Sequence, residues 1–294
     1  EPCPEDFSHF VQCISMNVTP VPLCMGSIYP STEDRLFVGI PVFLLSCASI
    51  LLNTTLLRIL LIKRSFLEPN FRRHIISIII SSIGYILVNY YCFLPIVLFG
   101  VVISDPWLII LASPNSSFFQ AIQFSNLAIA IDRFLMFFTP HAHQSMTSSY
   151  RTRYILLLLP WFFSTFIVIH SSSIGYYKRV NPYTLKYTYE CSSGGLYEPI
   201  LFAFGFLWPS VMFFLYFSIF INVMVKKSSL SRTKPSDLLF VIQLSIISLL
   251  QLFSSLFFNF APQVMGSSRW TALFMTFFST LNSMNNPIVM IIFQ

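Results

Sequence analysis

The segment Asn126-Leu-Ala-Ile-Ala-Ile-Asp-Arg-Phe-Leu-Met-Phe-Phe138 places two charged residues, Asp132 and Arg133, near the end of a long apolar run. A charge at membrane depth costs about 3 kcal/mol or more, so the two side chains should pair or reach interfacial water. A plainer interpretation is that Arg133 only marks a helix end at the interface. A second polar interruption, Leu281-Asn-Ser-Met-Asn-Asn-Pro-Ile-Val-Met290, favours a functional role for both segments.

The composition indicates an integral membrane protein. The chain has 294 residues, of which 55% are hydrophobic and only 10% are charged, and its mean hydropathy is +0.72. Soluble domains carry about 25% charged residues. The formal charge of +6 therefore reflects loops beside membrane lipid and predicts no nucleic-acid partner.

Residues 1–35 form a polar tail, and residues 36–294 form a membrane domain of seven segments, each long enough to cross about 30 Å of hydrocarbon. The predicted spans are 36–62, 75–101, 108–138, 154–175, 196–225, 238–260 and 270–293. The start of the third span is ambiguous, because residues 104–107 and 112–117 both resemble a loop. We place the loop at 104–107, since the other choice makes the preceding helix about 38 residues long.

The basic residues predict the orientation. Most lie after the first, third and fifth spans or at the same ends of those helices, as Arg58, Lys63, Arg64, Arg72, Arg73, Arg133, Arg151, Arg153, Lys226, Lys227, Arg232 and Lys234. Cytoplasmic loops are enriched in Lys and Arg, so these loops should be cytoplasmic and the N-terminus outside.

Four cysteines, Cys3, Cys13, Cys24 and Cys191, fall in segments predicted to lie outside. An oxidising compartment favours disulfides, and four cysteines allow three pairings. The alternative is that they are free thiols in a mobile tail. Asn17 begins an Asn-Val-Thr sequon in the tail and is a candidate glycosylation site.

Seven spans with Asp-Arg-Phe at the inner end of the third and Asn-Asn-Pro in the seventh resemble a rhodopsin-like G-protein-coupled receptor. The Phe-rich spans, the Ala-Ile-Asp-Arg-Phe form of the motif and the short inner loops are most similar to the serpentine chemoreceptors of nematodes. The resemblance implies an all-α fold and a heterotrimeric G protein as partner. It also implies a plasma-membrane location, in the sensory cilium if the receptor is chemosensory.

The resemblance assigns switch roles to both motifs. In that family an Asp such as Asp132 holds an Arg such as Arg133 at rest, and the Arg turns toward the G protein on activation. Phe134 replaces the usual Tyr. Asn286 and Pro287 match the seventh-span motif, in which Pro frees a backbone carbonyl that nearby polar groups can satisfy. Met290 replaces the Tyr expected three residues after the Pro.

One departure concerns the disulfide of the family. No Cys stands at the start of the third span, so the usual tether to the second outer loop cannot form. We therefore expect Cys191 to pair with one of Cys3, Cys13 and Cys24, and the other two to pair together.

The resemblance implies a ligand site between spans three, five, six and seven. The candidate lining residues are Asn115, Phe119, Gln123, Phe257 and Trp270. Any single Phe could instead pack between helices or face lipid. No carboxylate lies at the depth of Asn115, which disfavours an amine ligand, and the last span has no Lys for retinal. We expect a small, weakly polar ligand, with a peptide as the alternative.

Asp237, at the inner start of the sixth span, could brace Arg133 or be a solvated flank charge.

A transporter or channel subunit is the rival class, disfavoured because the spans show no inverted repeat. No enzyme activity or cofactor is expected, and His141 with His143 is too weak a pattern to indicate a metal site.

Overall fold

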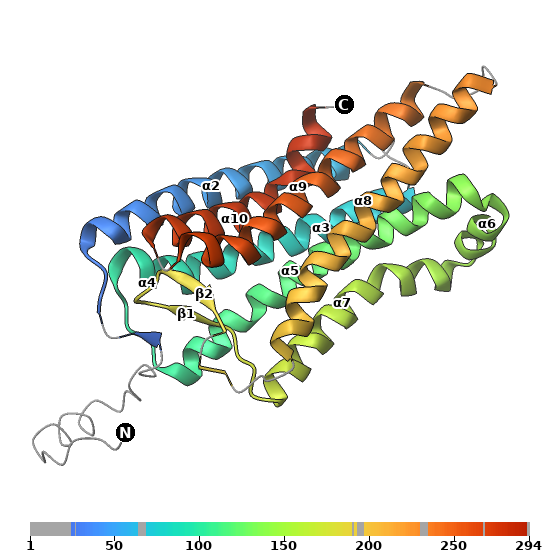
Figure 1. Ribbon diagram of the computed structural model, residues 1–294. Coiled ribbons are helices and arrows are strands. Elements are labelled where there is room, and N and C mark those ends of the chain that lie inside the picture. The colour runs from blue at the N-terminus through green and yellow to red at the C-terminus, as the bar shows by residue number, and fades with distance from the viewer. Residues whose placement is uncertain are drawn as a thin grey trace, which may run out of the picture.

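The helices follow the apolar segments of the sequence and run alongside one another (Figure 1). The computed structural model describes residues 25–26, 28–63, 69–189, 191–192, 197–229, 235–266 and 268–292. The elements are α2 (Thr32–Ile62), α3 (Pro69–Val88), the π-helix η2 (Asn89–Phe93), α4 (Leu94–Phe99), α5 (Asp105–Phe138), α6 (Pro140–Ser148), α7 (Tyr150–Ser173), β1 (Arg179–Asn181), β2 (Lys186–Thr188), α8 (Tyr197–Ser229), α9 (Pro235–Met265) and α10 (Arg269–Ile292). The β1–β2 hairpin lies at one end of the bundle, the hairpin end, and α6 lies at the other, the α6 end (Figure 1).

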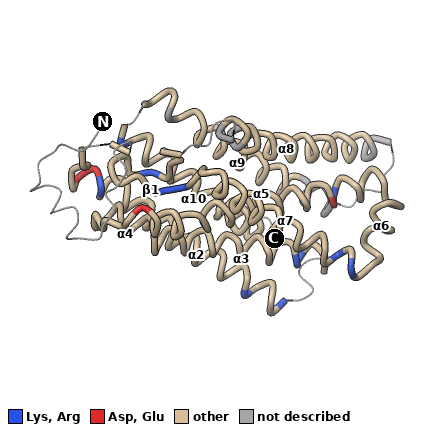
Figure 2. The backbone as a smooth tube through the Cα atoms, turned by 90° about the horizontal axis from the view of Figure 1, so that it is seen from below, with Lys and Arg blue, Asp and Glu red and all other residues tan. Residues whose placement is uncertain are grey.

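Within the described ranges, six helical segments are long and apolar enough to cross a membrane. They are Thr32–Ile62, Pro69–Phe99, Asp105–Phe138, Tyr150–Ser173, Ala203–Val225 and Ile242–Met265. Charged residues gather toward the two ends of the bundle and leave the stretch between them almost bare (Figure 2). The predicted all-helical membrane fold is confirmed, and the outside position of the N-terminus stays a prediction.

Helix α10 covers the seventh predicted segment but is not among the six segments that are apolar enough to cross a membrane. It has 24 residues, and Asn282, Asn285 and Asn286 are among its buried side chains. Because α10 packs against both α2 and α9, these amides face protein rather than lipid. The position of α10 in the bundle therefore accommodates polarity that a lipid-facing helix would not tolerate.

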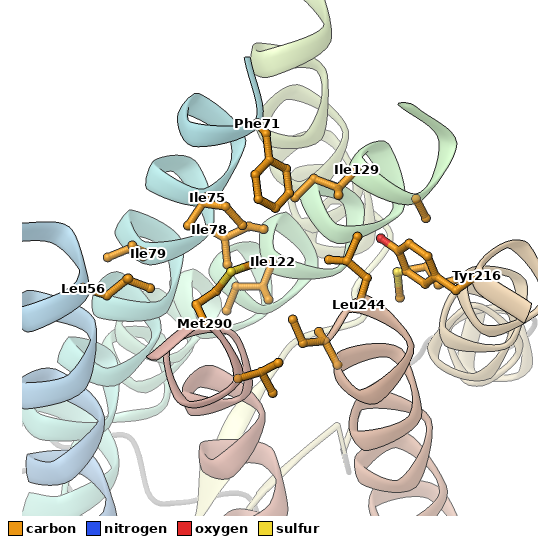
Figure 3. Close-up of a cluster of buried hydrophobic side chains, with 14 of the residues drawn as sticks. Leu56, Phe71, Ile75, Ile78, Ile79, Ile122, Ile129, Tyr216, Leu244 and Met290 are labelled. Atoms are coloured by element: carbon orange, nitrogen blue, oxygen red, sulfur yellow. The ribbon is translucent and has the colours of Figure 1, made fainter. Parts of the chain in front are cut away.

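A large apolar cluster fills the bundle toward the α6 end. Met290 of α10 is fully buried in it, together with Leu56, Ile75, Ile79 and Leu244 from three other helices (Figure 3). A Tyr at this position would bring a phenolic hydroxyl into these aliphatic side chains. The Met at position 290 is therefore matched to an apolar environment.

The second span is interrupted by the π-helix η2, two residues before Pro95. Proline has no N–H to donate to the carbonyl four residues earlier, and its ring clashes with that carbonyl. A wider turn relieves the clash. The interruption places Asn89 in the interior, where its side chain bonds to three other elements.

The hairpin is attached to the start of α5 by a bidentate ion pair. Arg179 Nε donates to Asp105 Oδ1 at 2.7 Å, and Arg179 Nη2 donates to Asp105 Oδ2 at 3.1 Å. The Asn181 amide donates to the Met25 carbonyl oxygen at 2.8 Å, and Val180 is buried against the helices. An ion pair thus connects these two segments at the place where the sequence lacks the family's cysteine.

Candidate functional site

A cavity of about 260 Å³ lies between the helices beneath the hairpin segment. Its volume is near the lower limit of small-molecule sites, which is about 300 Å³. The lining residues come from α5, α7, α8, α9, α10 and the segments flanking the hairpin: Ser116, Phe119, Gln120, Gln123, Phe124, Ile167, Tyr176, Lys178, Tyr189, Phe204, Gly205, Trp208, Pro209, Ser254, Ser255, Phe258, Asn259 and Ser279.

Aromatic rings form one side of this cavity. Phe124 of α5 meets Trp208 of α8 edge to face, with ring centroids 5.8 Å apart, and Phe204 stacks on Trp208 at 5.5 Å. Gly205 lines the cavity beside these rings, and a Cβ added there would lie 3.6 Å from Asn259 Nδ2, an ordinary van der Waals contact. This wall suits an apolar ligand body.

Polar groups gather on the side nearest the hairpin. Lys178 lines the cavity, and its Nζ donates to Asn115 Oδ1 at 2.6 Å and lies 4.7 Å from the centre of the Tyr187 ring. Burial lowers the pKa of Lys178 to about 7. Tyr189 shares a hydrogen bond of 2.9 Å with Ser116.

A buried amide network lies behind this polar side. Asn89 Oδ1 accepts from Asn115 Nδ2 at 3.4 Å and from the Tyr187 hydroxyl at 3.0 Å, and Asn89 Nδ2 reaches Thr280 Oγ1 at 3.5 Å. Four elements, η2, α5, β2 and α10, are therefore joined through one side chain.

The predicted ligand residues are divided between the cavity and its surroundings. Phe119 and Gln123 line the cavity, and Asn115 lies behind it as the partner of Lys178. Phe257 stacks on Phe278 with ring centroids 4.2 Å apart, and Trp270 packs edge to face on Phe37 at 4.7 Å. Neither of these two is in the lining of the described cavity.

Several lining residues were not identified from the sequence. Phe258 lines the cavity in place of the predicted Phe257, and Trp208 and Lys178 are further lining residues that the sequence did not predict. The pair Trp208-Pro209 in the middle of an apolar span was an available signal, because a Pro inside a helix commonly marks a kink.

Near the α6 end, Asp132 contacts two basic side chains. Its Oδ1 lies 3.0 Å from His143 Nε2, and its Oδ2 lies 3.6 Å from Arg133 Nε. Arg133 is buried and its guanidinium lies 4.9 Å from the centre of the Phe71 ring. Asp132 thus holds α6 through His143 as well as contacting Arg133.

The other predicted switch residue, Phe134, lies on α5, and the predicted brace, Asp237, lies on α9. The Phe134 ring stacks on Phe138 at 4.4 Å. The side chain of Asp237 lies outside the described part of the chain. No metal-binding group of His, Cys, Asp or Glu occurs among the described residues, which include His141 and His143.

The backbone around Pro287 is satisfied from α2. Pro287 cannot donate to the Ser283 carbonyl, and Asn53 Nδ2 donates to that oxygen at 3.1 Å. The expectation that a nearby polar group satisfies the freed carbonyl is confirmed. Both amide atoms of the buried Asn286 have no hydrogen-bond partner among the described residues.

The predicted disulfide and glycosylation sites lie mostly outside the described residues, as Cys3, Cys13, Asn17 and Cys24. Cys191 is disulfide-bonded. The identity of its partner stays a prediction.

Comparison with protein families gives a match over most of the chain. The model of the family described as serpentine type seven-transmembrane G-protein-coupled chemoreceptor Srx matches residues 43–294, which include every helix from within α2 to α10 and both motifs. No curated protein matches the chain.

Proposed function

The chain belongs to the Srx family of serpentine seven-transmembrane chemoreceptors, and we propose that its ligand is a small, largely apolar molecule held in the cavity beneath the hairpin segment. The membership makes it a multi-pass membrane receptor that acts through a G protein. We further propose that it works at the plasma membrane of a sensory cell, in the cilium.

The observation that carries the ligand proposal is the aromatic wall beside Gly205. The Trp208 and Phe124 rings provide apolar surface inside the bundle, and burial of such surface contributes about 25 cal/mol per Å² to binding. The cavity of about 260 Å³ favours a small molecule over a peptide. The apolar cluster around Met290 favours a switch over a conducting path.

We propose that α5 carries the signal from the cavity to Arg133. Gln123 lines the cavity, and Arg133 follows ten residues later, about 15 Å along the helix axis. A ligand that prefers one packing of α5 against α8 and α9 shifts the population toward that packing. Arg133 then leaves Asp132 and turns to the G protein.

The test is nucleotide exchange on a panel of G proteins, using membranes that carry the chain and pools of small volatile and water-soluble compounds. The Gly205→Leu variant should lose the response because Leu fills the cavity, and Arg133→Ala should lose it because the switch is absent. Leu207→Phe is the matched control, since Leu207 is on the same helix, is 45% exposed and does not line the cavity.

Surface labelling must show equal amounts of each variant. A response that survives Gly205→Leu would place the ligand elsewhere, and a response that survives Arg133→Ala would remove Arg133 from the switch. A compound-dependent current without nucleotide exchange would instead support the transporter or channel interpretation.

A further inference from the structure

Lys178 is held in an environment built for an ammonium group. Its Nζ donates to the Asn115 amide oxygen at 2.6 Å and lies 4.7 Å from the centre of the Tyr187 ring and 6.0 Å from that of Tyr189. An amide oxygen and two aromatic faces all attract a cation. The Lys178 side chain is partly buried and lines the cavity.

The positive charge of Lys178 is not balanced by a described carboxylate. The adjacent Arg179 is paired with Asp105 at 2.7 Å, and no ion pair of Lys178 occurs among the described residues. The titratable groups near Lys178 are Cys92 of η2 and the two tyrosines, Tyr187 and Tyr189. Glu190, the acid nearest in sequence, lies outside the described residues.

The pKa of Lys178 is lowered because its buried charge is not balanced by a described carboxylate. Without an anion nearby, burial destabilises the charged form, and the pKa falls to about 7. A carboxylate within about 4 Å would favour the charged form again. A bound anion therefore stabilises the charged form of Lys178 more than it would stabilise that of an exposed lysine.

Gln123 supplies a second polar group that lacks a partner. It is only 6% exposed, it lines the cavity, and its Oε1 has no hydrogen-bond partner among the described residues. Its amide can present either the oxygen or the NH₂ group to a ligand. A buried polar atom without a partner costs about 1–3 kcal/mol, which a polar ligand group would recover.

The polar and aromatic parts of the cavity are separated along its length. Ser116 beside Tyr189 and Phe124 beside Trp208 are eight residues apart on α5, or about 12 Å. The Lys178 side is nearer the hairpin and the Phe124 side is nearer the α6 end. A ligand with a charged head and an apolar body of a few carbon atoms matches this arrangement.

We propose that Lys178 binds the anionic head of the ligand and that the receptor selects small carboxylic acids with an apolar body over the matching neutral compounds. This inference rests on the proposed function, because it concerns the same cavity. The aromatic wall accounts only for the apolar body of the ligand, and Lys178 accounts for the charge of the ligand's head group.

The probes are straight-chain carboxylic acids of four to eight carbons, benzoic acid, and the matching primary alcohols. Each is tested for nucleotide exchange on membranes carrying the full chain, and for a shift in the unfolding temperature of the purified chain in detergent. The variants are Lys178→Met, which keeps the length without the charge, and Lys178→Arg, which keeps the charge.

The acids should stimulate exchange at lower concentrations than the alcohols. Lys178→Met should raise the effective concentration of the acids about 10–100-fold, the effect of removing one charge-assisted hydrogen bond. It should change the ratio of acid to alcohol potency, and Lys178→Arg should preserve that ratio.

The pH dependence gives an independent readout. Carboxylic acids are ionised above about pH 5, and Lys178 is charged below its pKa of about 7, so acid potency should be greatest between these values. Above pH 7 it should fall by up to about tenfold per pH unit. Lys178→Arg should abolish this fall, because arginine stays charged.

The outcomes separate this proposal from the proposed function. If acids stabilise the wild-type chain but not Lys178→Met and no exchange follows, the anion site stands and the signalling proposal fails. If alcohols drive exchange and acids act equally on Lys178→Met, the receptor stands and the anion site is wrong. The anion site is also wrong if acids neither stabilise the chain nor stimulate exchange.

Discussion

Replacing Asp105 with Asn should loosen the hairpin and lower the stability of the chain. The change removes the charge that pairs with Arg179, whose side chain is only 5% exposed, whereas that of Asp105 is 21% exposed. Removing one partner of a fully buried ion pair costs about 3–5 kcal/mol. The partial exposure of Asp105 and the oxygen that Asn retains reduce the expected cost to about 2 kcal/mol.

The assay is thermal unfolding of the purified chain in detergent, with ligand potency measured in parallel. A loss of about 2 kcal/mol should lower Tm by about 4–8 °C. Lys178 is one residue from Arg179, so potency should fall as well. The exchanged pair, Asp105→Arg with Arg179→Asp, should recover part of both losses.

Glu33→Gln provides the matched control. Glu33 contacts Arg269 at 3.3 Å, but their side chains are 83% and 44% exposed, and exposed pairs contribute about 0–1 kcal/mol. Equal Tm shifts for Asp105→Asn and Glu33→Gln would show that the Arg179 pair does not hold the hairpin. High salt should weaken the control pair more than the buried one.

Three other substitutions test the α6 half of the bundle. Asn53→Ala should lower the free energy of unfolding by about 1–3 kcal/mol, measured by thermal unfolding. The loss should be smaller in a Pro287→Ala background, where the backbone N–H of Ala can donate to the Ser283 carbonyl oxygen. Equal losses in both backgrounds would contradict this account. Met290→Tyr should cost about 1–3 kcal/mol by overpacking, and an unchanged Tm would show that the cluster has room for the ring. Asp132→Asn should raise basal nucleotide exchange about fivefold, because Arg133 loses its anion; lower basal exchange would reverse the assigned role.

The sequence was sufficient for the helices because apolar length is a strong signal. Each predicted span overlaps a helix, including α10, which carries several buried amides. The satisfied carbonyl before Pro287 was also predictable, because the missing N–H is a property of the residue itself.

The face of α9 that lines the cavity was not predictable from the sequence. Phe257 and Phe258 are adjacent, so their side chains point about 100° apart, and both are Phe. Composition cannot decide which ring faces inward when every face of a helix carries aromatic residues. The structure places Phe258 in the cavity and Phe257 on Phe278.

Lys178 was missed for a different physical reason. A charged residue in a loop is normally solvated, and strands of three residues are too short to show a periodic pattern. Its burial results from the closure of the hairpin over α5, which depends on Asp105, more than 70 residues earlier in the chain. Such a long-range contact leaves no local signal.

The π-helix η2 divides the second span into two halves that can change separately. A π-turn contains one residue more than an α-turn, so it rotates everything beyond it by about 100° relative to a regular helix. Deleting one residue from 89–93 would turn the face that α4 presents at the hairpin end while α3 kept its register near Phe71. A single insertion or deletion at this turn would thus reorient the hairpin end of the second span and leave the end near Phe71 unchanged.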